Sequence, residues 1–264
     1  MKILIFISLI AYFLSTLGFW FYLYTKKEKG RKIGFSLFGI GFLIQIVYLL
    51  GTVVFHGYFP ISTISDILFF LSMVIGAIFY GFSLYKKNLK EFGAIYAPII
   101  VFLIALSLPS YSSSEQVYDN IWFYAHVVFS ILAYAFIIAA TVIAIIYLLT
   151  ERDLKRKNLK SFFVSKFSSS LSTLLDLEYK ATLMIFIFLS LALITSSIWS
   201  SVYLGKHWLW DKKQIMLSIL WIFYGFLLQI MLIKHQYKKR ASYLTIVGSI
   251  LALIAFWIIE HPNY

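Results

Sequence analysis

Cysteine is absent from this chain of 264 residues, and charged residues make up only 13% of it. The first absence excludes a disulfide framework, a thiolate metal site and any chemistry by a thiol of the chain itself. The second excludes an ordinary soluble domain, because such domains contain about 25% charged residues. Hydrophobic residues make up 61% of the sequence, and the mean hydropathy is +0.88. We therefore expect a lipid bilayer to be the solvent of most of the chain.

Two further absences concern nucleotides and acidic charge. The phosphate-binding pattern G-x-x-x-x-G-K-[ST] does not occur, so nothing predicts a soluble nucleotide-binding domain. Acidic residues number 11 against 23 basic ones, which gives a net charge of +12. The basic residues form short clusters between apolar runs, a pattern typical of membrane topology and not of a nucleic-acid surface. No nucleic-acid partner is expected.

Long apolar runs dominate the sequence. A helix needs about 20 residues to cross the hydrocarbon core, and a backbone in lipid must satisfy its own hydrogen bonds. The run at 93–109 is the shortest and contains Pro98. Only Lys2 precedes the first run, which lacks a small-residue cleavage site, so we interpret it as a span and not as a signal peptide. The sequence predicts an all-α, polytopic membrane helix bundle, a single integral membrane domain over 1–264. Its eight spans are 3–24, 33–56, 64–85, 93–109, 122–149, 181–203, 214–233 and 241–260.

The number of basic residues alternates between high and low from one gap between spans to the next. If the gaps are numbered along the chain, the odd gaps hold 19 of the 23 basic residues, whereas the even gaps hold only Lys206, Lys212 and Lys213. The positive-inside rule therefore predicts cytoplasmic odd gaps and both termini outside, in a multi-pass protein of the cytoplasmic (inner) membrane. The fifth gap, a basic cytoplasmic loop at 150–179, interleaves Phe and Leu with Lys and Ser. It is either an amphipathic helix on the anionic inner leaflet or a solvated linker.

The gap between the sixth and seventh spans carries an unusual group of side chains. Trp208-Leu209-Trp210-Asp211 follows a lysine and a histidine and precedes two lysines. The predicted topology places this loop on the outer face. Four of the five histidines fall on the same face, and only His235 falls in a cytoplasmic gap. The outer histidines are His56, His126, His207 and His261.

Histidines and indoles on one face suit a planar ligand. Imidazole is an axial ligand of haem iron, and two imidazoles fill both axial positions. A porphyrin can stack on indole rings, and lysines or indole N–H groups suit its propionates. The residues alone leave a second interpretation open. Tyr203, Trp208 and Trp210 have the amphipathic rings that are enriched at any membrane interface, and an interfacial histidine can be a structural hydrogen-bonding residue.

The stretch from Trp199 to Gln214 resembles the tryptophan-rich signature, or WWD domain, of a known family. The family comprises haem-handling cytochrome c assembly proteins of the CcsA/ResC and CcmC type, with HemX-type relatives. Its pattern is W-(four or five residues)-WG-x-x-W-x-W-D-x-K-E, on the outer face before a span. Leu204 and Gln214 depart from it, because tryptophan and glutamate are usual there. The matching residues are Trp199, Gly205, Trp208, Trp210, Asp211 and Lys213.

Three other segments are similar to the same family, so the resemblance covers about 56–261. Tyr124–Ala135, which includes His126, resembles the HV-(five or six residues)-YA segment. Phe59–Asp66 resembles P-x-S-N-x-x-E, although we interpret Asp66 first as a cap of the third span. Arg240–Leu244, followed by Gly248, resembles the R-A-A-Y-L…G start of the last span.

The resemblance implies a haem-binding component of cytochrome c biogenesis, presenting haem b at the outer face for attachment to an apocytochrome c. The haem would be bound only transiently. Trp199, Trp208, Trp210 and Asp211 would hold it, with His126 and His261 as axial ligands. A CcsB/ResB-like membrane partner is expected, and a thiol-reducing protein is compatible with this role. The chain would be a non-catalytic haem-handling subunit sooner than a stand-alone enzyme.

Two departures and two alternatives accompany this interpretation. Gln229 stands where the CcsA type has a histidine for an inner haem, and His261 comes about five residues early. A HemX-type protein that regulates or senses haem biosynthesis, without a cytochrome partner, remains an alternative. A small-solute transporter is less favoured, because the spans contain few ionisable residues. The roles of His56 and His207 stay open.

Overall fold

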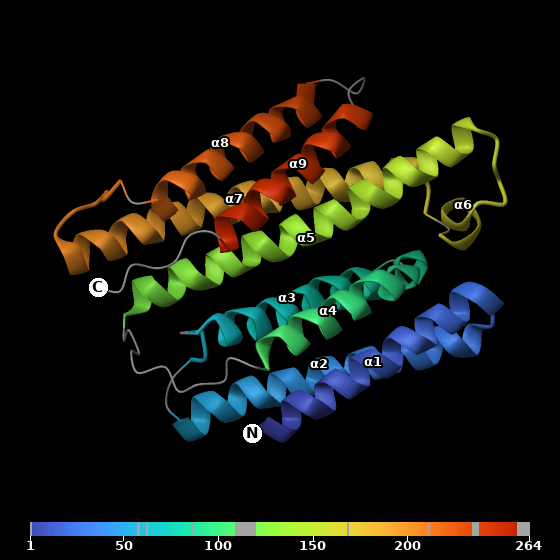
Figure 1. Ribbon diagram of the computed structural model, residues 1–264, viewed down its shortest axis with the longest axis horizontal. Coiled ribbons are helices and arrows are strands. Elements are labelled where there is room, and N and C mark those ends of the chain that lie inside the picture. Colours follow the sequence, from blue (N-terminus) through green and yellow to red (C-terminus); the bar gives the residue numbers. More distant parts are fainter. Residues whose placement is uncertain are drawn as a thin grey trace. The chain divides into compact units, whose positions relative to one another are not determined.

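A computed structural model describes residues 2–56, 59–61, 63–85, 87–108, 120–167, 169–210, 212–233 and 238–257. Within these ranges every regular element is a helix, which confirms the predicted all-α class. Figure 1 shows these helices, coloured along the sequence. The elements are α1 (Lys2–Thr25), α2 (Glu28–His56), α3 (Ile64–Tyr85), the 3-10 helix η1 (Lys87–Phe92), α4 (Gly93–Ser107), α5 (Ile121–Lys155), α6 (Phe162–Lys166), α7 (Leu171–Leu204), α8 (Lys212–Ile233) and α9 (Lys238–Trp257).

Eight helical segments in the described residues are long and apolar enough to cross a membrane, which confirms the predicted number. Two of them extend further than the apolar runs at 122–149 and 181–203. α5 continues to Lys155, and α7 already begins at Leu171. Polar residues support these extensions: the Ser170 side chain accepts the backbone N–H of Thr173, and Lys180 pairs with Asp176 one turn earlier. The ends of the basic loop 150–179 are therefore helical. Which ends of the helices face outward stays a prediction.

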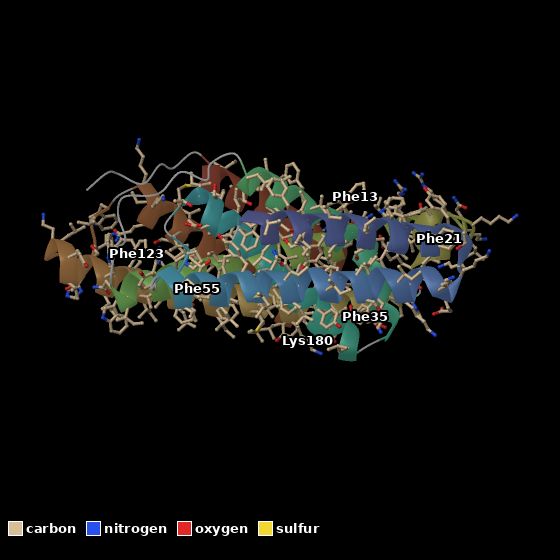
Figure 2. All side chains as sticks on the ribbon, turned by 90° about the horizontal axis from the view of Figure 1, so that it is seen from below. Phe13, Phe21, Phe35, Phe55, Phe123 and Lys180 are labelled. Carbon is tan, nitrogen blue, oxygen red and sulfur yellow. The ribbon has the colours of Figure 1, made fainter. Side chains whose placement is uncertain are left out.

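The chain divides into two compact units. Unit 1 comprises Met1–Tyr118 and Lys157–Ser169, and unit 2 comprises Asp119–Arg156 and Ser170–Tyr264. Exposed apolar side chains cover the outside of the helices, as Phe13, Phe21 and Phe55 illustrate in unit 1 (Figure 2). An exposed apolar surface of this extent is expected of a protein in contact with lipid.

Unit 1 packs α1 against α2 and α4, and α3 against α4. A chain of hydrogen bonds runs through its interior. The Tyr12 hydroxyl donates to Gln45 Oε1 at 2.9 Å, Gln45 Nε2 donates to Ser72 Oγ at 2.8 Å, and Ser72 Oγ donates to the Phe69 carbonyl oxygen at 2.6 Å. These side chains from α1, α2 and α3 are fully buried. Polar pairing between buried helices fixes how they are rotated and shifted against one another.

α3 begins with a reciprocal cap. The Thr63 hydroxyl accepts the backbone N–H of Asp66 at 3.1 Å, and the Asp66 carboxylate accepts the N–H of Thr63 at 3.2 Å. This arrangement is a capping box, in which two otherwise unpaired donors of the first turn are satisfied. The interpretation of Asp66 as a helix cap is confirmed.

Unit 2 is a closed ring of four helices. α5 packs against α7 and α9, and α8 packs against the same two helices. Ala133, Ala140 and Ala144 are buried along α5, and small residues let helices approach closely in a membrane. Gly248 of α9 serves the same purpose, because a Cβ there would lie 2.7 Å from the Phe223 ring and 2.9 Å from the Tyr224 hydroxyl.

Candidate functional site: an indole loop at one end of unit 2

The sixth membrane helix, α7, ends in a left-handed turn. Gly205 has φ of +66° and its N–H donates to the Ser201 carbonyl oxygen at 3.1 Å. A residue with a Cβ is disfavoured in this conformation, which explains glycine as the C-cap. The turn reverses the chain into the indole loop, which we define as residues 205–210. α8 begins at Lys212.

Three serines of α7 hold the indole loop against the end of the helix. Ser200 Oγ donates to the Lys206 carbonyl oxygen at 2.7 Å, and Ser197 Oγ donates to that of His207 at 3.1 Å. Ser201 Oγ lies 3.4 Å from Nε2 of the His207 ring. The sequence interpretation missed these residues. Their spacing of three and four, which places them on one helix face, was the available signal.

Gln214 of α8 holds the other side of the loop. Its Oε1 accepts the backbone N–H of Leu209, the residue between the two indoles, at 2.8 Å. The Gln214 side chain is buried. A glutamate, which is usual at this position in the resembled family, offers the same acceptor. The departure at 214 therefore preserves the contact that fixes the loop.

The two loop indoles differ in exposure. Their ring centroids lie 6.0 Å apart in an edge-to-face arrangement with an interplanar angle of 80°. Trp210 is 76% exposed and has φ of +56°, a strained conformation for a bulky residue. Trp208 Nε1 is buried and has no hydrogen-bond partner among the described residues. A buried donor without an acceptor is costly, so this N–H suits a ligand oxygen.

A third indole lies in the last turns of α7. Trp199 stacks on Tyr203 with centroids 5.7 Å apart, and its ring lies 6.0 Å from that of Phe123 at the start of α5. Phe123 is labelled in Figure 2. The beginning of α5 and the end of α7 are thus in contact at the end of unit 2 that carries the indole loop.

His126 lies one turn further along α5. Its Nδ1 is 2.9 Å from the carbonyl oxygen of Ala192 in α7. A carbonyl can only accept, so Nδ1 carries the hydrogen and the lone pair of the neutral ring is on Nε2. Metal-binding histidines characteristically donate their second ring N–H to such an acceptor, which fixes ring orientation and tautomer. Ala192 precedes Trp199 by seven residues, about 10 Å along the helix axis.

The structure thus gathers four of the six predicted site residues, Trp199, Trp208, Trp210 and His126, at one end of unit 2. Asp211 and His261 lie outside the described residues, as does His235, so their roles stay predictions. Of the remaining positions, His207 is exposed in the loop and Gln229 is exposed on α8. His56 ends α2 in unit 1.

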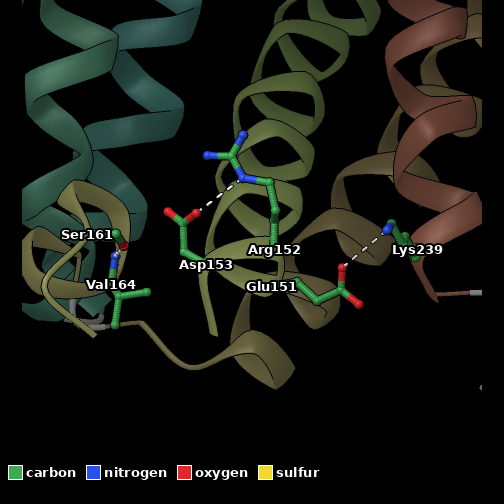
Figure 3. Close-up of polar contacts among 6 residues, drawn as sticks. All are labelled: Glu151, Arg152, Asp153, Ser161, Val164 and Lys239. Atoms are coloured by element: carbon green, nitrogen blue, oxygen red, sulfur yellow. Dashed lines mark hydrogen bonds and ion pairs between the residues drawn. The ribbon is translucent and has the colours of Figure 1, made fainter. Parts of the chain in front are cut away.

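The opposite end of unit 2 holds buried acids that the sequence interpretation did not single out. Glu178 of α7 is fully buried, and its two carboxylate oxygens accept from Ser242 Oγ and Thr245 Oγ1 of α9, each at 2.7 Å. Glu151 of α5 lies 3.8 Å from Lys239 of α9 (Figure 3). These acids lie in the helical extensions beyond the predicted spans, where they connect α9 to α5 and α7.

Fold and site together define a class: a polytopic membrane protein that displays an ordered aromatic loop, with a nearby oriented imidazole, at one end of a four-helix bundle. The profile of the family described as "Cytochrome C assembly protein" matches residues 4–261. The chain therefore belongs to the cytochrome c assembly protein family, and this membership supports a role in cytochrome c biogenesis.

Individual relatives agree with the family. The chain is 28% identical to the cytochrome c biogenesis protein CcsA of Guillardia theta, over 95% of this chain and 90% of that protein. It is 25% identical to CcsA of Cyanidium caldarium, over 76% of this chain and 78% of that protein. A solved structure named cytochrome c heme lyase CcmF is similar in fold, with a TM-score of 0.74 and 13% identity. The match covers 98% of this chain but only 46% of the CcmF chain.

Proposed function

We propose that this chain binds haem at the indole loop and presents it at the outer membrane face for attachment to an apocytochrome c. The observation that carries the proposal is the oriented His126 imidazole, held by the Ala192 carbonyl oxygen at 2.9 Å at the end of unit 2 that displays the loop. A neutral histidine with Nδ1 as donor can offer Nε2 to iron. The relatives named CcsA act in cytochrome c biogenesis, in agreement with this proposal.

The indole loop fits haem in shape and in chemistry. Exposed Trp210 offers a flat apolar surface to the macrocycle, and the buried Trp208 N–H offers a donor. The exposed lysines Lys206 and Lys212 have the charge that the propionates require. Within the same proposal Asp211 positions the loop or accepts a hydrogen bond, and His261 is the second axial ligand.

The chain's own contribution is binding and orientation. Haem supplies the groups to which the cysteine thiols of a C-x-x-C-H segment become attached, and this chain contains no cysteine. The thiols must therefore come from the apocytochrome, with a CcsB/ResB-like partner to hold it and a thiol-reducing protein to keep it reduced. Holding two reactants in a fixed geometry is itself a large contribution to rate. The bound species proposed is haem b, released once it is attached.

A HemX-type role, without a cytochrome partner, is the second candidate. Gln229, at the position of the inner histidine of the CcsA type, is exposed on α8 and is not an imidazole. An amide there favours a chain with a single, outer haem site. The two roles differ in whether a CcsB-like partner is needed for haem to accumulate on the chain.

The test is the absorption spectrum of the chain purified in detergent after co-expression with a CcsB-like partner. We expect a haem spectrum for the wild type and its loss in His126→Ala, with recovery when free imidazole is added. His207→Ala is the matched control, because it removes an exposed imidazole from the loop but keeps the carbonyl that Ser197 binds. A haem-free wild type would refute the proposal, whereas haem retained by His126→Ala would refute only the ligand assignment.

The outer location is tested separately. A reporter fused after Lys206 should be active only on the external side. Cytoplasmic activity would show that the predicted topology is wrong and that the indole loop faces the cytoplasm, where it could not present haem to an external apocytochrome.

A further inference from the structure

The short helix α6 belongs to unit 1, although it follows α5 in the chain. Phe162 stacks on Trp20 of α1 with ring centroids 6.3 Å apart. Phe167, buried just after the helix, lies 5.5 Å from Phe92 of η1 and 6.1 Å from Phe163. α6 is therefore a packed element of unit 1 and not part of a solvated linker.

Two polar contacts hold α6 in place. The Ser161 hydroxyl accepts the backbone N–H of Val164 at 3.3 Å and caps the first turn (Figure 3). Lys26, directly after α1, donates from Nζ to the carbonyl oxygen of Lys166 at 2.9 Å, across 140 residues of sequence. A lysine near the last carbonyls of a helix satisfies groups that have no partner inside the helix.

These contacts place α6 beside the end of a membrane span. α1 ends at Thr25, and its last turns carry Trp20 and Tyr24, whose rings lie 5.9 Å apart. The Trp20 indole N–H donates to the Ala94 carbonyl oxygen at 3.1 Å. Tryptophan and tyrosine at the end of a span are typical of the boundary between hydrocarbon and headgroups. α6 therefore lies at the depth of the lipid headgroups.

The surface around α6 is strongly basic. Lys26, Lys157 and Lys160 are exposed, and Lys166 is half-buried. Two acids lie at this end of unit 1 among the described residues. Glu28 pairs with Arg31 at 2.6 Å, and buried Glu91 accepts from the Tyr22 hydroxyl at 3.1 Å. These two partners, Arg31 and Tyr22, lie in α2 and α1 and not in the α6 segment.

We propose that α6 forms a binding site for the headgroup of an anionic phospholipid. The α6 patch consists of Lys26, Lys157, Lys160, Lys166 and Leu159. Two of these lysines lie over aromatic rings of α1: Lys26 Nζ is 5.3 Å from the Tyr22 ring centroid, and Lys166 Nζ is 5.9 Å from that of Tyr24. In the proposed site the ammonium groups bind the phosphate. Leu159, which is 68% exposed, contacts the upper part of the acyl chains. Location at the membrane boundary and an exposed leucine among the cations favour a lipid over a soluble polyanion.

The experiment is a titration of the detergent-solubilised full chain with dioleoylphosphatidylglycerol, read by native mass spectrometry. Dioleoylphosphatidylcholine is the uncharged control lipid. The test variant carries Lys157→Gln, Lys160→Gln and Lys166→Gln. The matched variant carries Lys27→Gln, Lys29→Gln and Lys32→Gln, which removes three exposed cations at the same end of unit 1 but outside the patch.

Each lysine near an anionic surface contributes about fivefold to binding. We therefore expect the test variant to lose about a hundredfold in phosphatidylglycerol affinity, and the matched variant to lose less than about tenfold. Equal losses in the two variants would mean diffuse attraction and would overturn the proposal. So would equal affinity of the wild type for both lipids, or a DNA oligonucleotide that binds the patch while phosphatidylglycerol does not.

Discussion

The buried hydrogen-bond chain of unit 1 and the indole loop of unit 2 differ in how their polar groups are satisfied. In unit 1 the chain from Tyr12 through Gln45 to Ser72 is closed, because every donor in it has an acceptor inside the unit. In unit 2 the indole loop is held by Gln214 and the serines of α7, yet it leaves the buried Trp208 N–H without an acceptor among the described residues.

This difference shows two roles of buried polar groups in a membrane protein: fixing helix packing and binding a ligand. A chain of hydrogen bonds in which every donor has an acceptor fixes the register of the helices. It offers nothing to a ligand, because its hydrogen-bonding capacity is already used. A loop that is fixed by its backbone but displays an open donor and an exposed ring is suited to binding. Substitutions in the hydrogen-bond chain of Tyr12, Gln45 and Ser72 should therefore change stability alone, and substitutions in the loop should change ligand affinity more than stability.

The largest effect is expected in unit 1. Gln45→Leu leaves the buried Tyr12 hydroxyl without its acceptor, which should lower the free energy of unfolding by about 2 kcal/mol. Haem content per folded molecule should not change. Equilibrium unfolding in mixed detergent micelles measures the first quantity, and the absorption spectrum measures the second.

The same substitution in unit 2 provides the control. Gln229 is exposed on α8, so Gln229→Leu should leave stability unchanged or raise it slightly. If Gln229→Leu were as costly as Gln45→Leu, burial of the amide would not explain the stability of unit 1.

Gly81 in unit 1 and Gly205 in unit 2 allow the two units to be compared by backbone conformation. A Cβ at Gly81 of α3 or at Gly205 would meet no atom within 4 Å, but only Gly205 has a positive φ. Gly205→Ala should therefore destabilise unit 2 by about 1.5 kcal/mol. Gly81→Ala should stabilise unit 1 by up to about 1 kcal/mol. Equal effects on unfolding would show that the left-handed turn does not constrain the loop.

Much of the fold could be predicted from sequence because lipid imposes simple rules. Apolar length gave eight spans, and all eight occur. The ends of α5 and α7 could not be located in this way. Those ends depend on caps and ion pairs such as that of Lys180 with Asp176, whereas hydropathy reports only the hydrocarbon layer.

The candidate site could be predicted only in part. Residue types and the family pattern pointed to the indoles and His126. The contacts that fix the loop could not be anticipated, because Ser200 and Gln214 act on backbone groups whose positions depend on the left-handed turn at Gly205. Glu178 was missed because its partners, Ser242 and Thr245, are more than 60 residues away in sequence.

Gln214 connects loop geometry to ligand affinity. Gln214→Leu removes the acceptor of the Leu209 N–H and should weaken haem binding about tenfold, as loss of a supporting hydrogen bond does at other metal sites. Gln214→Glu keeps an acceptor and should retain most of the affinity. Haem titration of the purified apoprotein, followed by absorbance, gives both values. Equal weakening by the two variants would mean that the amide N–H₂ group, and not the oxygen, is what the loop requires.

The smallest expected effect concerns Trp210, and it tests the comparison most directly. The ring is largely exposed, so Trp210→Ala should leave the unfolding of the haem-free protein unchanged. Loss of one stacking surface should weaken haem binding about threefold, and Trp210→Phe should recover most of that loss. A closed structural element would respond in the opposite way, with reduced stability and unchanged affinity. If Trp210→Ala behaved so, the strained backbone at this residue would serve packing of the loop, and the loop would resemble the interior of unit 1 more than a binding surface.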